Sequence, residues 1–460
     1  MNILQQIIDN STDFFNYALK KMETPDYGMH QLMPEAQHFA NNLVTMMVSS
    51  LLEEMDQALY DAVKPTHTVR IKEKARPRTL VTTLGEVRYT RRYYEHKDSH
   101  TYGSLLDPWM QIPTYARIET ACKAQLVAHA ADASYAKAAS QTTPCALSRQ
   151  SVMNAIRQTG TLPNDAAPLP QPKEKMPRVF IEADEDHVAM REGKAKPLKL
   201  VYVYEDKVTV GKNRRQLVGT RMFTGYEKSA DLWREVDTYL QQAYPGKDAP
   251  EVSIIGDGAY WIQSGTNHIY KGQNALDAFH VTKYIRKIAG NGNRQKLYQA
   301  LRENQPNAFQ DACRYFEIKR PGKKQAIRKG QHYIQNHWES IQRTLRDSAI
   351  SSSTECHVSH LLSERLSSRG MGWSPKGSEQ IARLRTMKCN GGDVIAYVEK
   401  KLTAPTPQIS SMIATPILKK QVAKHVKPYC NQAEIQYAMP GSESALHSWM
   451  RAIEHSGFMN

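Results

Sequence analysis

The sequence contains few cysteines, and none of them forms a close pair. Six cysteines are scattered over 460 residues, at positions 122, 145, 313, 356, 389 and 430. Disulfide frameworks and cysteine zinc sites need short, regular spacings, so this pattern indicates reduced and mostly structural thiols. His357 and His360 lie close to Cys356, but no second ligand pair accompanies them, and zinc is not expected there.

A long hydrophobic run is also missing. The longest apolar stretch, around Leu43 to Leu52, is interrupted by Ser49 and Ser50 and is too short to span a bilayer. The N-terminal residues MNILQQIIDNSTDFF have neither the basic start nor the apolar core of a signal peptide. These absences lead us to expect a cytoplasmic protein.

Acidic residues are outnumbered by basic ones. Lysine and arginine total 61 against 46 aspartates and glutamates, which gives a formal net charge of +15. A chain this basic favours a polyanionic partner, because each neutralised phosphate releases counterions. The composition therefore predicts nucleic acid as partner, although a merely basic surface would give the same number.

The N-terminal region is predicted to be helical and then to form a β-hairpin. Residues 1–65 include a helix over 29–62 with a methionine-rich packing or dimerising stripe. Residues 66–95 alternate as strands around Leu84-Gly85. The second strand interleaves arginines and tyrosines, so DNA contact and a plain edge strand are both open. Its candidate DNA ligands are Arg88, Arg91 and Arg92.

Three helices are predicted over residues 117–158, and the last two resemble a helix-turn-helix. The segments ASYAKAASQTT and LSRQSVMNAIRQ are separated by Pro144-Cys145-Ala146. Ser148 is placed to cap the second of these helices. Its outer face would carry residue types that contact bases or phosphates in the major groove, although many helix pairs share this pattern. These residues are Arg149, Gln150, Asn154 and Arg157. Residues 66–158 thus form the predicted DNA-binding region.

A proline-rich linker over residues 159–177 precedes an α/β pattern. Strands are predicted at 177–184, 198–206, 216–226 and 252–255, with a fifth near NALDAF and an amphipathic helix at 229–244. This order suggests a mixed sheet covered by helices over residues 178–400. Residues 290–350 are predicted to be helical and basic, and residues 401–460 to form a helical tail.

Two aspartates end apolar strands. Asp184 closes PRVFIEAD, and Asp257 closes EVSIIGD between Gly256 and Gly258. If the strands are neighbours, both carboxylates reach the edge at which open α/β sheets bind ligands. The flanking glycines fit either an ordinary turn or the close approach of a metal or phosphate.

A third carboxylate is predicted on the buried face of a helix. Glu355 falls in line with Val358, Leu362 and Leu366 at helical spacing. Two aspartates and a glutamate suit hard divalent cations, and two Mg²⁺ ions about 4 Å apart promote phosphodiester chemistry. A basic chain with such a cluster is expected to cut or join nucleic acid, with Mn²⁺ able to replace Mg²⁺.

Several blocks of sequence resemble a known family. In the C-terminal half they are IEADEDHV, IIGDGAYWI, LDAFHVTKYI and TECHVSHLLSERLSSRGMGWSPKG; earlier ones are RTLVTTLGEVRYTRRYY and ASYAKAASQ. They resemble the ISLre group of bacterial insertion-sequence transposases, long treated as an uncharacterised family. The resemblance implies a DDE transposase with an RNase H-like core, and its triad carries over onto Asp184, Asp257 and Glu355. Asp186 is a rival for the first position.

The resemblance also sets expectations for the surroundings of the triad. Asp257 and Glu355 are 98 positions apart in the sequence, which implies a helical insertion that residues 290–350 would supply. His280 and Arg365 are supporting candidates that would orient a phosphate or hold DNA, with structural roles as alternatives. Trp373 is a candidate for stacking on a flipped base, against packing in the core.

The function predicted from these features is metal-dependent cleavage and strand transfer of DNA. Partners would be double-stranded terminal repeats and target DNA, bound by at least a homodimer at the bacterial nucleoid. One alternative is a metal-dependent nuclease that cuts without joining. Another is a catalytically silent, transposase-derived DNA-binding regulator.

Overall fold

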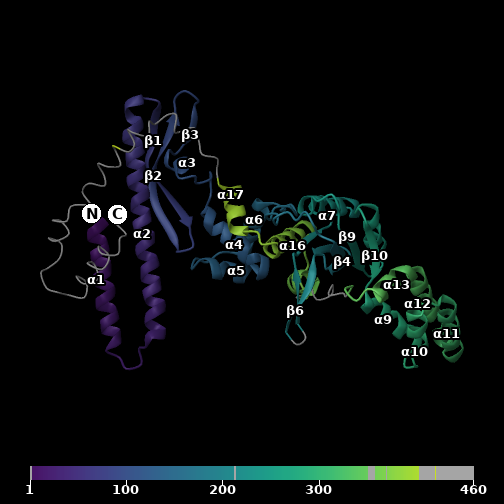
Figure 1. The fold of residues 1–460 in the computed structure, drawn as a ribbon. Helices are drawn as coiled ribbons and strands as arrows, with labels where there is room; N and C mark the ends of the chain where they lie inside the picture. The colour runs from purple at the N-terminus through teal and green to yellow at the C-terminus, as the bar shows by residue number, and fades with distance from the viewer. Residues whose placement is uncertain (1–2, 212–213, 351–357, 369, 404–419, 421–460) are drawn as a thin grey trace. The chain divides into compact units, whose positions relative to one another are not determined.

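A computed structural model describes residues 3–211, 214–350, 358–368, 370–403 and 420 (Figure 1). They belong to two compact units. The first unit contains the described residues up to Leu126, Tyr135–Val152 and those from Val398 on, and the second contains Val127–Ser134 and Met153–Tyr397. Within the described ranges, no helix combines the length and the hydropathy needed to cross a membrane.

The first unit packs a long helix against a small antiparallel sheet. Its helices are α1 (Ile3–Met22), α2 (Met29–Val63), η1 (Lys64–Thr66), α3 (Leu106–Trp109) and α5 (Tyr135–Thr142). Its strands are β1 (Val69–Val81), β2 (Glu86–His96) and β3 (Thr101–Gly103), in the order β1-β2-β3. The predicted helix and hairpin are confirmed, but β2 is the central strand and not an edge strand.

Two helices run from one unit into the other. α4 (Thr120–Asp132) and α6 (Arg149–Thr159) complete the three helices predicted between residues 117 and 158. Along α6, Val152, Ala155 and Ile156 are buried. The four polar residues predicted for the outer face are exposed, as their helical spacing requires.

The second unit is built on a mixed five-stranded sheet in the order β10-β9-β4-β5-β8. These strands are β4 (Arg178–Val188), β5 (Lys196–Tyr204), β8 (Arg221–Gly225), β9 (Glu251–Gly256) and β10 (Gly272–Leu276). β5 pairs antiparallel with β4 and β8, whereas β9 pairs in parallel with β4 and β10. The fold is therefore mixed α/β, as predicted.

The third predicted strand needs a correction, because residues 216–226 are two strands. β6 (Asp206–Gly211) and β7 (Arg214–Val218) form a separate hairpin, and β8 follows. The break falls at Gly219, which has a φ of +63°. A side chain there would also meet Glu205, whose carboxyl carbon would lie 2.4 Å from the added Cβ. Apolar residues on both sides of Gly219 make the segment resemble one continuous strand in the sequence.

Helix α7 (Ser229–Ala243) covers one face of the sheet. Its buried residues Leu232, Trp233 and Val236 pack with Ile181 of β4 and Ile254 of β9. Two short helices, α8 (Tyr260–Gln263) and η2 (Ser264–Asn267), connect β9 to β10. Alternation along β4 therefore directs Phe180, Glu182 and Asp184 away from α7.

Residues 290–350 are largely helical, as predicted. This segment contains α10 (Gln295–Arg302), α11 (Pro306–Lys319), η3 (Pro321–Lys323), α12 (Lys324–Asn336) and α13 (Trp338–Arg346). These helices share an apolar core with α9 (Ala278–Ala289), centred on Phe309, Ile327 and Ile334. The segment is thus packed onto the helix that follows β10.

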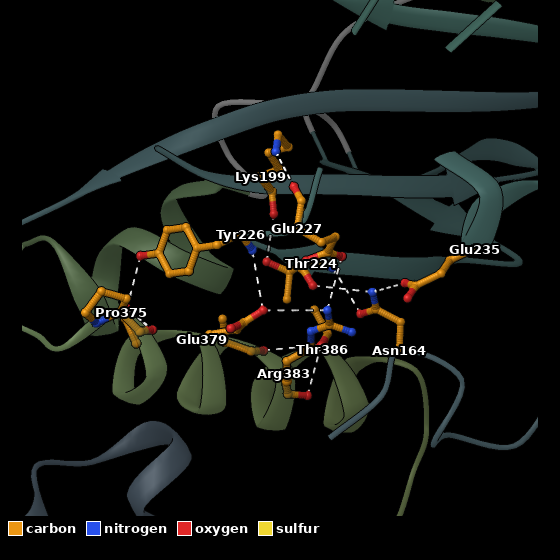
Figure 2. A network of polar contacts seen from close by, with 12 residues as sticks. Asn164, Lys199, Thr224, Tyr226, Glu227, Glu235, Pro375, Glu379, Arg383 and Thr386 are labelled. Carbon is orange, nitrogen blue, oxygen red and sulfur yellow. Dashed lines mark hydrogen bonds and ion pairs between the residues drawn. The ribbon is translucent and has the colours of Figure 1, made fainter. Parts of the chain in front are cut away.

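The rest of the second unit is helical, and the predicted linker packs against it. The segments are η4 (Ser359–Ser363), α15 (Glu364–Leu366), α16 (Pro375–Cys389) and most of α17 (Val394–Leu402). Asn164 pairs with the backbone of Thr224 on β8, beside the ion pair of Arg383 on α16 with Glu227 (Figure 2). Residues 159–177 lack helix and strand but include buried Leu162 and Ala167. They are therefore part of the second unit.

Candidate active site

Asp184 and Asp257 lie side by side at one edge of the sheet. β4 and β9 pair in parallel up to Glu182 and Ile255. Asp257 directly follows β9, but Asp184 does not end its strand as predicted, because β4 continues to Val188 in its pairing with β5. The pKa of Asp184 is raised to about 6, mainly by burial and in part by the charge of Asp257. The Glu185 N–H, which donates to Asp184 at 2.8 Å, opposes this shift. The sheet thus brings together the first two predicted catalytic carboxylates.

The glycines around Asp257 serve the turn. Asp257 Oδ1 accepts a hydrogen bond from the Ala259 N–H at 2.8 Å, and its carbonyl accepts one from the Tyr333 hydroxyl. Gly258 has a φ of +85°, and an added Cβ would lie 2.7 Å from the His337 ring. An added Cβ at Gly256 would lie 2.8 Å from the Ile262 side chain. Backbone conformation and packing therefore account for both glycines.

A third aspartate joins this edge. Asp277 directly follows β10, and its N–H donates to the Gly256 carbonyl at 2.9 Å, extending the parallel pairing with β9. Its buried side chain caps α9 by accepting from the Phe279 N–H at 2.9 Å. Sequence analysis missed Asp277 as a site residue. The signal was present in NALD, where a short apolar segment is followed by aspartate, as in EVSIIGD.

His280 is placed beside these carboxylates. Its Nδ1 lies 3.5 Å from Asp277 Oδ2. The pairing with Asp277 raises the pKa of His280, and the charge of Asp257 adds to it, while burial and Lys283 lower it. The His280 charge in turn lowers the pKa of Asp184. His280, predicted as a supporting residue, therefore interacts electrostatically with the aspartates at this edge.

Asp186, the rival first carboxylate, has a different environment. It is buried and accepts a hydrogen bond from Ser367 Oγ at 3.1 Å. Burial raises its pKa, and hydrogen bonds from Ser367 and Ser363 lower it. Asp186 stands two residues beyond Asp184 along β4 and pairs with Leu198. The geometry therefore favours Asp184 as the neighbour of Asp257.

Glu355, the predicted third carboxylate, lies outside the described residues. The stripe on which it was placed is described from Val358 on, and Val358, Leu362 and Leu366 are all buried as predicted. The segment η4 packs beside β4. Among the described residues, no group of three or more His, Cys, Asp or Glu side chains could hold a metal ion.

Arg365 and Trp373 are interior residues. Arg365 is 2% exposed, and its guanidinium carbon lies 5.0 Å from the centre of the Trp373 ring. It donates to the Ala130 carbonyl at 3.3 Å, and the Trp373 indole donates to the Leu366 carbonyl at 2.9 Å. These placements argue against DNA contacts and support the structural alternative for both residues.

The arginines of β2 are mostly committed to acidic partners. Arg91 is buried in a two-bond pair with Asp107 at 2.8 and 2.9 Å, and Arg92 pairs with Asp56 at 2.6 Å. Arg88 is exposed and pairs with Glu86. Of the three predicted DNA ligands on this strand, only Arg88 has the exposure that a phosphate contact requires.

Comparison with known proteins places the chain in a family. Residues 27–401 match the family described as "Uncharacterised protein family (UPF0236)". A UPF0236 protein of Caldanaerobacter subterraneus subsp. tengcongensis is 30% identical over 403 residues, covering 86% of this chain and 84% of that protein. A second from the same organism is 30% identical with coverages of 86% and 79%. One of Streptococcus gallolyticus is 25% identical over 262 residues, covering 53% and 57%. The chain belongs to the uncharacterised protein family UPF0236.

Proposed function

We propose that the protein is a DNA transposase of the DDE type with an RNase H-like catalytic core. The observation that carries the proposal is the register of two neighbouring parallel strands, which places Asp184, within β4, beside Asp257, which directly follows β9. The raised pKa of Asp184, caused by burial and by Asp257, indicates a pair of carboxylates that a bound cation would stabilise.

The arrangement of the second unit supports this proposal. β4, β5 and β8 form an antiparallel series, and β9 and β10 add in parallel on the other side of β4. The helices α10 to α13 fill the long interval between Asp257 and Glu355. The resemblance noted in the sequence implies both a mixed sheet of this kind and an insertion at this place.

The names of the relatives give independent support. Three UPF0236 proteins of Caldanaerobacter subterraneus subsp. tengcongensis carry names that join eleven, four and two locus designations. A name of this form is expected when one protein is encoded at several places in a genome. Such repetition favours a transposable element over a single-copy regulator.

The residues of the site would take distinct roles. Asp184 and Asp257 would hold two Mg²⁺ ions, with Glu355 as a third ligand; such ions activate the attacking oxygen and stabilise the leaving oxygen of a phosphodiester. His280, whose pKa is raised by its pairing with Asp277, would orient a phosphate of the scissile strand. Exposed residues on α6, including Arg149 and Arg157, would contact the DNA of the element's ends.

A cleavage assay tests the proposal. The substrate is DNA carrying the sequences that flank the gene, incubated with the full chain and Mg²⁺ or Mn²⁺. Asp257→Asn should abolish cleavage and leave DNA binding intact, whereas Asp231→Asn, at a surface position near the start of α7, should behave as the native protein. Cleavage retained by Asp257→Asn would remove Asp257 from the site.

Pre-cleaved ends separate the proposal from its rivals. A transposase should join them to target DNA, and light scattering should show at least two chains in the complex because two ends must be paired. A simple nuclease would cut intact DNA without joining. A silent regulator would bind the ends and do neither.

A further inference from the structure

Two aromatic side chains are exposed beside the carboxylate edge. Tyr260 is 86% exposed and opens α8, three residues after Asp257. Phe279 is 48% exposed and is the second residue of α9, two residues after Asp277. Single exposed aromatic residues are ordinary on protein surfaces. Two of them directly after the ends of neighbouring strands, next to a carboxylate pair, indicate a surface that binds a partner molecule.

Short turns hold both rings in place. Each turn is organised by an aspartate: Asp257 accepts the N–H of Ala259, and Asp277 accepts the N–H of Phe279 itself. β9 and β10 pair in parallel to their last residues, so the two turns start about 5 Å apart. Both rings therefore stand on short connections that directly follow the strand ends next to Asp257 and Asp277.

The charge near Phe279 favours a nucleic acid as that partner. Lys283 lies four residues after Phe279, on the same side of α9, and is exposed. It is close enough to His280 to lower the pKa of the histidine. An aromatic ring with a lysine one turn away can contact both a base and a phosphate of one strand.

We propose that Tyr260 and Phe279 stack on unpaired nucleobases next to the phosphate held at the carboxylate edge. This proposal rests on the proposed function, because the carboxylates must act on DNA for a base to lie there. Bases inside a duplex have both faces covered, so the strand must be unpaired at these positions. The preferred substrate is then an element end whose bases are frayed or flipped beside the scissile phosphate.

Photocrosslinking in the presence of Ca²⁺ tests the contact without requiring cleavage. The full chain binds end DNA that carries 5-iododeoxyuridine next to the scissile phosphate, and mass spectrometry locates the attachment. Crosslinks are expected at Tyr260 or Phe279. Crosslinks confined to other residues would overturn the proposal.

Matched variants measure the contribution of stacking to affinity. Tyr260→Ala and Phe279→Ala should weaken binding of DNA with unpaired terminal bases roughly tenfold, whereas Tyr260→Phe should keep the affinity because the ring remains. Tyr270→Ala is the control: Tyr270 is 72% exposed but precedes β10, at the opposite end of that strand. Thermal melts verify that each variant is folded.

The outcomes separate the two proposals. If the native chain cleaves end DNA and Asp257→Asn does not, but Tyr260→Ala and Phe279→Ala bind as well as Tyr270→Ala, then only the stacking proposal is wrong. If the native chain neither binds nor cleaves end DNA, the proposed function is wrong, and the stacking proposal falls with it.

Discussion

At the residue scale, burial and the charge of Asp257 both oppose the ionisation of Asp184. The ordinary pKa of an aspartate in an unfolded chain is about 4. Ionisation is therefore harder in the folded protein, and the folded state loses stability as the pH rises from about 4 to about 6. Above this window the loss is complete.

We expect Asp184→Asn to stabilise the metal-free protein at pH 7.5. Asparagine keeps the acceptor for the Glu185 N–H and removes the unfavourable charge. The gain in the free energy of unfolding should be at most about 3 kcal/mol above pH 6 and should vanish near pH 4. Urea denaturation at several pH values measures it. A difference independent of pH would contradict the assigned cause.

Added Mg²⁺ tests whether Asp184 is a metal ligand. The cation should raise the melting temperature of the native protein above pH 6 and have little effect on Asp184→Asn. Asp186→Asn is the control, because Asp186 is also buried with a raised pKa but bonds to Ser367. Asp186→Asn should therefore keep the Mg²⁺-dependent rise in melting temperature. If this rise is lost, Asp186 and not Asp184 is the first metal ligand.

At the scale of elements, helix α2 is attached to strand β2 through a buried ion pair. Asp56, 2% exposed, accepts from the Arg92 side chain at 2.6 Å and from the Arg92 N–H at 3.2 Å. The Arg92 guanidinium also lies over the Tyr60 ring, 4.8 Å from its centre. Burial nevertheless raises the pKa of Asp56. Arg92 of β2 therefore stabilises the interior of the first unit by its contacts with α2.

Asp56→Ala should lower the free energy of unfolding by about 2 to 4 kcal/mol. The change leaves Arg92 without its carboxylate and the β2 backbone without an acceptor. Arg88→Ala, which breaks an exposed pair on the same strand, should cost less than about 1 kcal/mol. Chemical denaturation compares the two variants; equal losses would show that burial of the pair is unimportant.

At the scale of the whole molecule, the second unit is assembled from separated stretches of chain. The carbonyl of Ala130 accepts from Arg365, and Asp132 accepts from Arg385 at 2.6 Å and from Lys388. The segment after α6 is held in the same way, since Arg221 donates to the carbonyls of Asn164, Ala167 and Pro168. Domain boundaries placed in the proline-rich segment therefore cut through the second unit.

Truncated proteins test this division. A fragment of residues 120–403 should be soluble and melt cooperatively, whereas a fragment of residues 178–403 should melt at least 5 °C lower or aggregate. The shorter fragment leaves Arg221 and Arg365 buried without their carbonyl acceptors. Equal melting temperatures would mean that residues 120–177 add nothing to the unit.

Local patterns in the sequence determined much of this protein. Local patterns predicted α2, the β1–β2 hairpin, the exposed face of α6 and the helices over residues 290–350, because each depends on neighbours a few residues away. The apolar segments before Asp184 and Asp257 were predicted as strands, and the parallel pairing of β4 with β9 places these segments next to each other. Family membership followed from sequence similarity over residues 27–401.

Only the tertiary structure decided which polar residues are buried and which strands adjoin. Residue type alone does not distinguish Arg88, Arg91 and Arg365. Arg91 and Arg365 are buried because they bond to groups elsewhere in the chain. Asp277 joined the site because β10 pairs with β9, a choice of sheet order that no local pattern encodes. Long-range pairing, burial and pKa depend on residues far apart in sequence, and the fold alone brings these together.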